Sequence, residues 1–98
     1  MRIVGLEILD DFSALHGDAR SWIANWVAQT AAAKWRTPQD VKERHASASL
    51  LAGNIVIFNV RGNRYRLETK ISYELGVIGI KWIGAHDAYN RRTRRTLQ

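Results

Sequence analysis

The sequence has no cysteine, a single proline and no long apolar run. Without cysteine it can form neither a disulfide scaffold nor a thiolate zinc site. Its longest uninterrupted apolar run, Ile55 to Phe58, is far too short to cross a bilayer. The N-terminal stretch has one basic residue, early acids and no long apolar segment, so it does not read as a secretory signal. We therefore expect a cytoplasmic protein without a membrane partner.

The chain is also short, with 98 residues, which predicts one domain spanning residues 1–98 around one core. This length leaves no room for separate cofactor and substrate domains. Apolar residues make up 46% of the sequence and there are four tryptophans, a composition that excludes a disordered tail.

Positive charge is concentrated in the C-terminal part of the sequence. Residues 1–60 contain six cations and six acids, whereas residues 61–98 contain nine cations and three acids. The whole excess of +6 therefore lies in the last 38 residues. Seven of those nine cations are arginines, which suit bidentate contacts with phosphate. The asymmetry favours a polyanion such as nucleic acid as the partner, against the simpler interpretation of a solvated basic surface.

The first third of the chain has the periodicity of a helical hairpin after a short β-type start at residues 2–4. One apolar stripe, at helical spacing, ends near Gly17: Ile8, Leu9, Phe12 and Leu15. Asp18 can cap a second helix. The stripe of that helix continues into an alanine run and predicts a core face: Ala19, Trp22, Ile23, Trp26, Val27 and Thr30.

A third helical start is predicted at Thr37–Asp40, with Thr37 as the N-cap and the only proline at the first helical position. A short helix through Lys42 or Arg44 should follow. Residues 45–53, which include His45, are predicted to form a connecting loop.

From residue 54 onward the period changes to two, which predicts three strands at residues 55–60, 64–71 and 77–83. Tight turns are expected at residues 61–63 and at Gly76. The second strand alternates cleanly, with an apolar face of Tyr65, Leu67, Thr69 and Ile71. In the third strand we expect Ile78, Ile80 and Trp82 on one face and Lys81 on the other.

These elements predict an α+β fold in which the helical hairpin covers one face of a small antiparallel meander. The opposite face should then carry a cluster of cations that two nearby acids cannot neutralise: Arg64, Arg66, Lys70 and Lys81. Such a face is suited to phosphate binding.

Two residues after the third strand have side chains suited to chemistry on RNA. His86 and Tyr89 are three apart and share a face if a helix begins there. Histidine transfers protons near neutral pH, and tyrosine offers a stacking surface. With Arg66 they would supply a proton-transfer group, a phosphate clamp and a base platform. The simpler interpretation of His86 is a residue at a helix start. The three histidines are dispersed and no metal or cofactor motif is present, so we expect neither a metal nor a cofactor.

Two phrases of the sequence resemble the HigB-type toxins of the RelE superfamily. They are residues 57–67, IFNVRGNRYRL, and residues 83–90, IGAHDAYN. The family carries a phrase like F-N-I/V-x-G-N-x-Y-R-L and a later T-H-x-x-Y-D, and the resemblance extends over about the whole chain. Ala85 and Asn90 depart from this pattern, which has threonine and an acid there. The lysine-rich strand of RelE itself is also missing, since Ile57 and Asn59 occupy the corresponding strand.

The resemblance implies a RelE-like fold with a short C-terminal helix and the toxin of a type II toxin–antitoxin pair. Such toxins are endoribonucleases (mRNA interferases) that cleave messenger RNA, typically on the translating ribosome, by metal-independent attack of a ribose 2′-hydroxyl. The implied partners are mRNA, the ribosome and a cognate HigA-like helix-turn-helix antitoxin. By motif, Arg66 would hold the scissile phosphate, His86 would transfer a proton or bind phosphate, and Tyr89 would stack on or orient the RNA. The expected supporting RNA contacts are Arg61, Arg64, Lys70, Lys81, Arg91 and Arg92. The general base stays open.

Two alternatives use the same residues without catalysis. The first is a nonenzymatic RNA- or ribosome-binding module whose binding weakens steeply with salt. The second is an interaction domain whose basic tail, residues 91–95, docks an acidic partner.

Overall fold

The computed structural model describes the backbone of residues 1–97 and the side chains of residues 1–91. Its elements follow in the order β1 (Arg2–Val4), α1 (Leu6–Leu15), α2 (Arg20–Ala32), α3 (Pro38–Arg44), β2 (Ser49–Leu51), β3 (Ile55–Val60), β4 (Tyr65–Ser72), β5 (Val77–Ala85) and α4 (His86–Leu97). The predicted α+β fold with a short C-terminal helix is confirmed.

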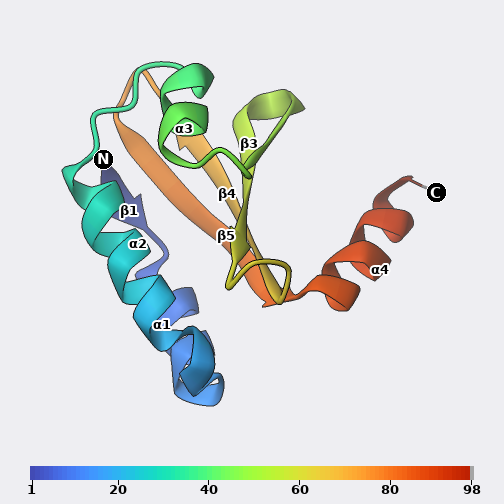
Figure 1. Ribbon diagram of the computed structural model, residues 1–98. Coiled ribbons are helices and arrows are strands. Elements are labelled where there is room, and N and C mark those ends of the chain that lie inside the picture. The colour runs from blue at the N-terminus through green and yellow to red at the C-terminus, as the bar shows by residue number, and fades with distance from the viewer. Residues whose placement is uncertain (98) are drawn as a thin grey trace.

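The strands form one five-stranded sheet in the order β1-β5-β4-β3-β2. Strands β3, β4 and β5 are the predicted antiparallel meander. Strand β1 pairs with β5 in parallel, which makes the sheet mixed. Strand β2 pairs with β3 inside the segment 45–53, so the prediction of a plain loop there is wrong. The helices α1 and α2 lie together along one side of the sheet, and α4 projects away from them beyond the end of β5 (Figure 1).

The core lies between the helices and one face of the sheet. The aromatic rings of Trp26 on α2 and Phe58 on β3 meet edge to face at 5.3 Å between centroids. The predicted inner face of β4 is buried in full, and Leu67 at its centre is 0% exposed. The stripe of α2 is likewise buried or half-buried. On α1 the stripe is shorter than predicted, because Leu15 at the C-terminal end of the helix is 82% exposed.

Close packing of α1 on the sheet depends on Gly5, just before the helix. Its φ of +93° is a left-handed conformation that favours glycine. A Cβ on this residue would also lie 3.1 Å from the carbonyl oxygen of Ile80 on β5. Glycine therefore allows the chain to turn from β1 into α1 directly over the neighbouring strand.

The start of α3 is the predicted one. The side chain of Thr37 accepts a hydrogen bond from the Asp40 backbone N–H, and the Asp40 carboxylate accepts one from the Thr37 N–H, which together form a capping box. The start of α2 differs from the prediction. A 3₁₀ turn at Gly17–Ala19 leads into the helix, and the N-cap residue is Ala19, not Asp18.

A bulge in β5 changes the prediction for Trp82. Thr69 pairs with Ile80 and Glu68 pairs with Trp82, so Lys81 is an extra residue opposite the Glu68–Thr69 step. Ile78 and Ile80 face the core as expected. Trp82 shares the face of Glu68, away from the core, because directly opposed residues in a sheet point to the same side.

Candidate active site

The face of the sheet turned away from α1 and α2, here called the outer face, has three rows of side chains across β3, β4 and β5. The register places Asn59, Arg66 and Gly84 in the first row. The second row contains Ile57, Glu68 and Trp82, and the third contains Ile55, Lys70 and Gly79. Arg66 and Lys70 are thus two cations of one strand separated by an acid.

Arg66 and His86 line the same hollow at the end of the outer face. The hollow has a volume of about 470 Å³ and is bordered by Asn63, Arg64, Arg66, Ala85, His86 and Asp87. The Nη1 atom of Arg66 is buried, and it has no hydrogen-bond partner in the part of the chain that the structure describes. The half-buried Arg66 side chain borders the hollow, and a guanidinium in such a place can bind an anionic oxygen.

His86 is the first residue of α4, and both neighbouring elements hold it. Its backbone N–H donates to the carbonyl of Arg64 at 3.2 Å. Its Nδ1 lies 3.2 Å from Nδ2 of Asn90, one helical turn later, and 3.9 Å from the Asp87 carboxylate. When the Asn90 amide donates to Nδ1, the neutral imidazole carries its proton on Nε2. His86 can then donate that proton to an oxygen atom in the hollow.

Tyr89 lies on α4 as predicted but does not border this hollow. Its ring is half-buried, and its centroid lies 6.0 Å from that of Trp82 with the planes tilted by 43°. The structure therefore places Arg66 and His86 at the same hollow and pairs Tyr89 with Trp82. Sequence reasoning missed Trp82, because strict alternation along β5 assigns it to the core.

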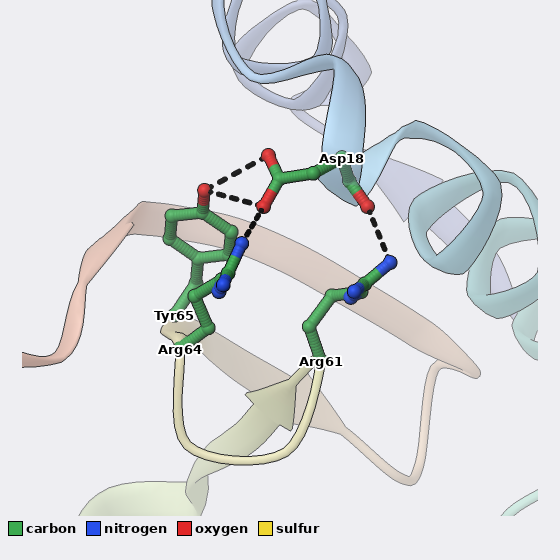
Figure 2. A network of polar contacts seen from close by, with 4 residues as sticks. All are labelled: Asp18, Arg61, Arg64 and Tyr65. Atoms are coloured by element: carbon green, nitrogen blue, oxygen red, sulfur yellow. Dashed lines mark hydrogen bonds and ion pairs between the residues drawn. The ribbon is translucent and has the colours of Figure 1, made fainter.

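Arg61 and Arg64, two of the predicted RNA contacts, lie at the β3–β4 turn and reach back to Asp18 (Figure 2). Arg64 forms an ion pair with the Asp18 carboxylate at 2.8 Å, and Arg61 donates to the Asp18 carbonyl at 3.1 Å. The Tyr65 hydroxyl also donates to this carboxylate at 2.9 Å. The cluster ties the α1–α2 connection to the turn that precedes Arg66.

The cluster also sets the protonation of its members. The hydrogen bonds from Arg64 and Tyr65 lower the pKa of Asp18. Asp18 in turn raises the pKa of Arg64, and burial together with Asp18 raises the pKa of the Tyr65 phenol. The carboxylate is therefore ionised and the phenol protonated near neutral pH. No local pattern signals this cluster, because Asp18 and Tyr65 are 47 residues apart.

Lys70 and Lys81 border a second hollow, of about 480 Å³, at the other end of the outer face. The tip of the Lys81 side chain lies over Gly79, directly beside Lys70 in the register. The two lysines from adjacent strands thus come together as the prediction required. Glu74 and Tyr73 also border this hollow.

The last two predicted RNA contacts lie on α4. Arg91 is exposed, whereas the side chain of Arg92 lies outside the described residues. Among the residues that the structure describes, no group of three or more histidine or acidic side chains could hold a metal ion. In the same residues no helix is long and apolar enough to cross a membrane.

No curated protein matches the chain. A family model described as HigB_toxin, RelE-like toxic component of a toxin-antitoxin system, matches residues 19–92. The match includes the cluster around Asp18 except for residue 18 itself, all of β4 and β5, and the start of α4. The chain therefore belongs to the HigB family of RelE-like toxins, the toxic components of toxin–antitoxin systems.

Proposed function

We propose that this toxin is an endoribonuclease that cleaves messenger RNA at the hollow between Arg66 and His86. The observation that carries the proposal is the meeting of the half-buried Arg66 side chain and the His86 imidazole at one hollow on a cationic sheet face. A phosphate oxygen is the natural partner of the first group, and proton transfer is the natural chemistry of the second.

The proposed reaction needs no metal. The ribose 2′-oxygen attacks the adjacent phosphorus, the O2′–P bond forms and the P–O5′ bond breaks. One proton leaves the 2′-hydroxyl for a base and one reaches the departing 5′-oxygen, so the products are a 2′,3′-cyclic phosphate and a 5′-hydroxyl. Arg66 stabilises the charge that develops on the phosphorane oxygens. His86, with its proton on Nε2, is the acid that protonates the 5′-oxygen.

The remaining cations have supporting roles in this proposal. Lys70 and Lys81 hold the RNA backbone at the far end of the outer face, and Arg91 and Arg92 extend the contact along α4. Arg61 and Arg64 contribute positive charge from the β3–β4 turn while they hold Asp18. Tyr89 supports the RNA through its contact with Trp82.

Measurements of growth arrest and of RNA cleavage test the roles of Arg66 and His86. Arg66→Ala and His86→Ala should each relieve growth arrest and reduce cleavage of a translated message about a hundredfold or more, while the protein stays folded. Arg36→Ala is the matched control, because it removes the same charge from an exposed position before α3. Full toxicity of both folded variants would rule out this site. RNA binding without any cleavage product would favour the nonenzymatic module.

The proposal includes the ribosome and an antitoxin as partners. Cleavage of a message should depend on its translation, which a comparison of naked and translated RNA measures directly. The antitoxin should be a HigA-like helix-turn-helix protein encoded next to the toxin, and its co-expression should restore growth. A neighbouring reading frame whose product neither binds nor neutralises the toxin would contradict this part.

A further inference from the structure

We infer that Trp82 is a stacking platform for a nucleobase, so that the RNA crosses the outer face with a base on the indole and phosphates at either side. This inference rests on the proposed RNA substrate and adds a binding subsite to it. The first observation is the bulge at Lys81, which turns Trp82 out of the core and onto the cationic face. A bulge beside a functional site commonly serves to redirect a side chain in this way.

The position of Trp82 on the strand beside Arg66 and Lys70 is the second observation. Arg66 borders one hollow and Lys70 borders the other, four residues further along β4. Four residues of strand span about 13 Å, too far for one phosphate group to contact both cations. Trp82 starts from the intervening row, opposite Glu68, and its ring extends over Gly84, the residue that pairs with Arg66. The half-buried indole is apolar and suits the uncharged face of a base next to a phosphate at Arg66.

The third observation is how the indole is held. A Cβ on Gly84 would lie 2.6 Å from Cζ2 of Trp82, so the benzene ring of the indole lies directly over the Gly84 backbone. Tyr89 on α4 contacts the same ring. The indole is half-buried and supported from two elements, which reduces the entropy that an aromatic platform loses when a base stacks on it.

The chemistry of such a platform determines what it recognises. Stacking of a base on an aromatic ring is favourable for all four bases, so Trp82 should add affinity with little sequence preference. It should also hold the sugar next to the scissile phosphate, because the indole lies over Gly84, the residue paired with Arg66. The occupant is thus an unpaired nucleotide of single-stranded RNA.

The experiment measures binding to RNA that cannot be cleaved. The probes are a 2′-O-methyl hexanucleotide, which lacks the attacking hydroxyl, and the same strand with abasic central nucleotides. Trp82→Leu in the full chain should bind the complete strand about tenfold more weakly and the abasic strand no more than twofold more weakly than the wild type. Trp82→Phe should keep affinity within about threefold, because it keeps an aromatic face. Trp22→Leu, on α2 in the helical layer, is the control and should change neither affinity.

Several outcomes would contradict the inference. Equal weakening for both strands would mean that Trp82 acts only by supporting Tyr89 and α4. Unchanged binding of folded Trp82→Leu would exclude stacking. If Trp82→Leu does not fold, tryptophan fluorescence replaces the affinity measurement. The complete strand should quench the emission of the wild type, and Trp82→Phe should lose that quenching. Equal quenching in both proteins would contradict stacking on Trp82. If the wild type binds the strand but cleaves no message, only the nuclease proposal is contradicted. If it binds neither strand at low salt, both the nuclease proposal and the stacking site at Trp82 are contradicted.

Discussion

His86 is held on its Nδ1 side by Asn90, a residue of its own helix. The family phrase has an acid at that position, and an amide differs from it by donating a hydrogen bond without adding a negative charge. When the Asn90 amide donates to Nδ1, the ring carries its proton on Nε2, the form that can donate to a leaving oxygen. The departure from the family phrase is therefore compatible with an acid role for His86.

We predict that Asn90→Ala removes this tautomer preference. Long-range ¹H–¹⁵N spectra should show the Nε2–H form of the neutral His86 ring in the wild type and a mixture of both tautomers in the variant. Asn25→Ala, an exposed amide on α2, serves as the control. Identical His86 spectra in the wild type and Asn90→Ala would contradict the role assigned to Asn90.

Asp18 is the residue on which the joint between the helical hairpin and the β3–β4 turn depends. Asp18→Asn should lower the urea midpoint near neutral pH, because the amide loses the ion pair with Arg64 and leaves Tyr65 with a weaker acceptor. The pKa of Asp18 is lowered on folding, so its contribution is present above the unfolded value of about 3.9 and is lost as the pH falls through the lower folded value. The variant should lack this part of the acid dependence. Asp11→Asn, on the exposed side of α1, is the control and should leave the urea midpoint unchanged. A similar decrease of the midpoint in both variants would contradict a stabilising role of the Asp18 cluster.

At the scale of the element, the bulge in β5 decides which side chains reach the outer face. Without an extra residue, Ile80 and Trp82 would share a face, since side chains alternate along a strand. With Lys81 inserted, both Lys81 and Trp82 lie on the outer face while Ile80 and Ile83 lie opposite Thr69 and Leu67 on the inner face.

We predict that deletion of Lys81 is tolerated, because Ile80 and Trp82 then pair with Thr69 and Glu68 in a regular ladder. The variant should unfold cooperatively and keep the amide signals of α4, although it loses one cation of the second hollow. Deletion of Ile80 is the matched control, since it places Lys81 opposite buried Thr69 and should prevent stable folding. Circular dichroism and urea titration distinguish the two deletions; equal damage from both would contradict the assigned register.

At the scale of the whole molecule, stability should depend on pH through His45, which joins the end of α3 to the core. Its ring meets Phe58 at 5.0 Å and Trp35 at 5.7 Å, and its Nε2 is buried without a partner in the described part of the chain. Burial, together with the charge of Arg44, lowers the pKa of His45. Other charges on or near this helix are Lys42 and Glu43.

The sign of this effect follows from proton binding. Below about pH 6.5 the unfolded chain binds a proton at His45, whereas the folded protein does not. The free energy of unfolding therefore falls as the pH decreases toward the lower folded pKa. We expect the urea midpoint of the wild type to decrease from pH 7.5 to pH 5.5, and His45→Phe to decrease less. Comparison at pH 7.5, where the ring is neutral in both states, measures the packing effect of the substitution separately. An equal decrease in both proteins would exclude His45 as the source.

The sequence alone determined the features that depend on near neighbours. Alternation along residues 65–71 predicts the buried face of β4, the Thr37–Asp40 box predicts the start of α3, and the C-terminal excess of cations predicts the charged face. The Y-R-L motif predicts Arg66 as the phosphate-binding cation, and Arg66 borders the first hollow. These signals are local because they come from backbone periodicity, capping and charge count.

Only the tertiary structure decided which distant residues meet. Asp18 binds Arg64 and Tyr65 instead of capping α2, since the nearest partner for its carboxylate comes from the turn of another layer. Trp82 faces outward because the pairing of β4 with β5 accommodates one extra residue, and β1 joins the sheet through a parallel register with β5. Ion pairs and strand registers between separate segments are selected by the packing of the whole chain, and short-range sequence patterns do not contain that information.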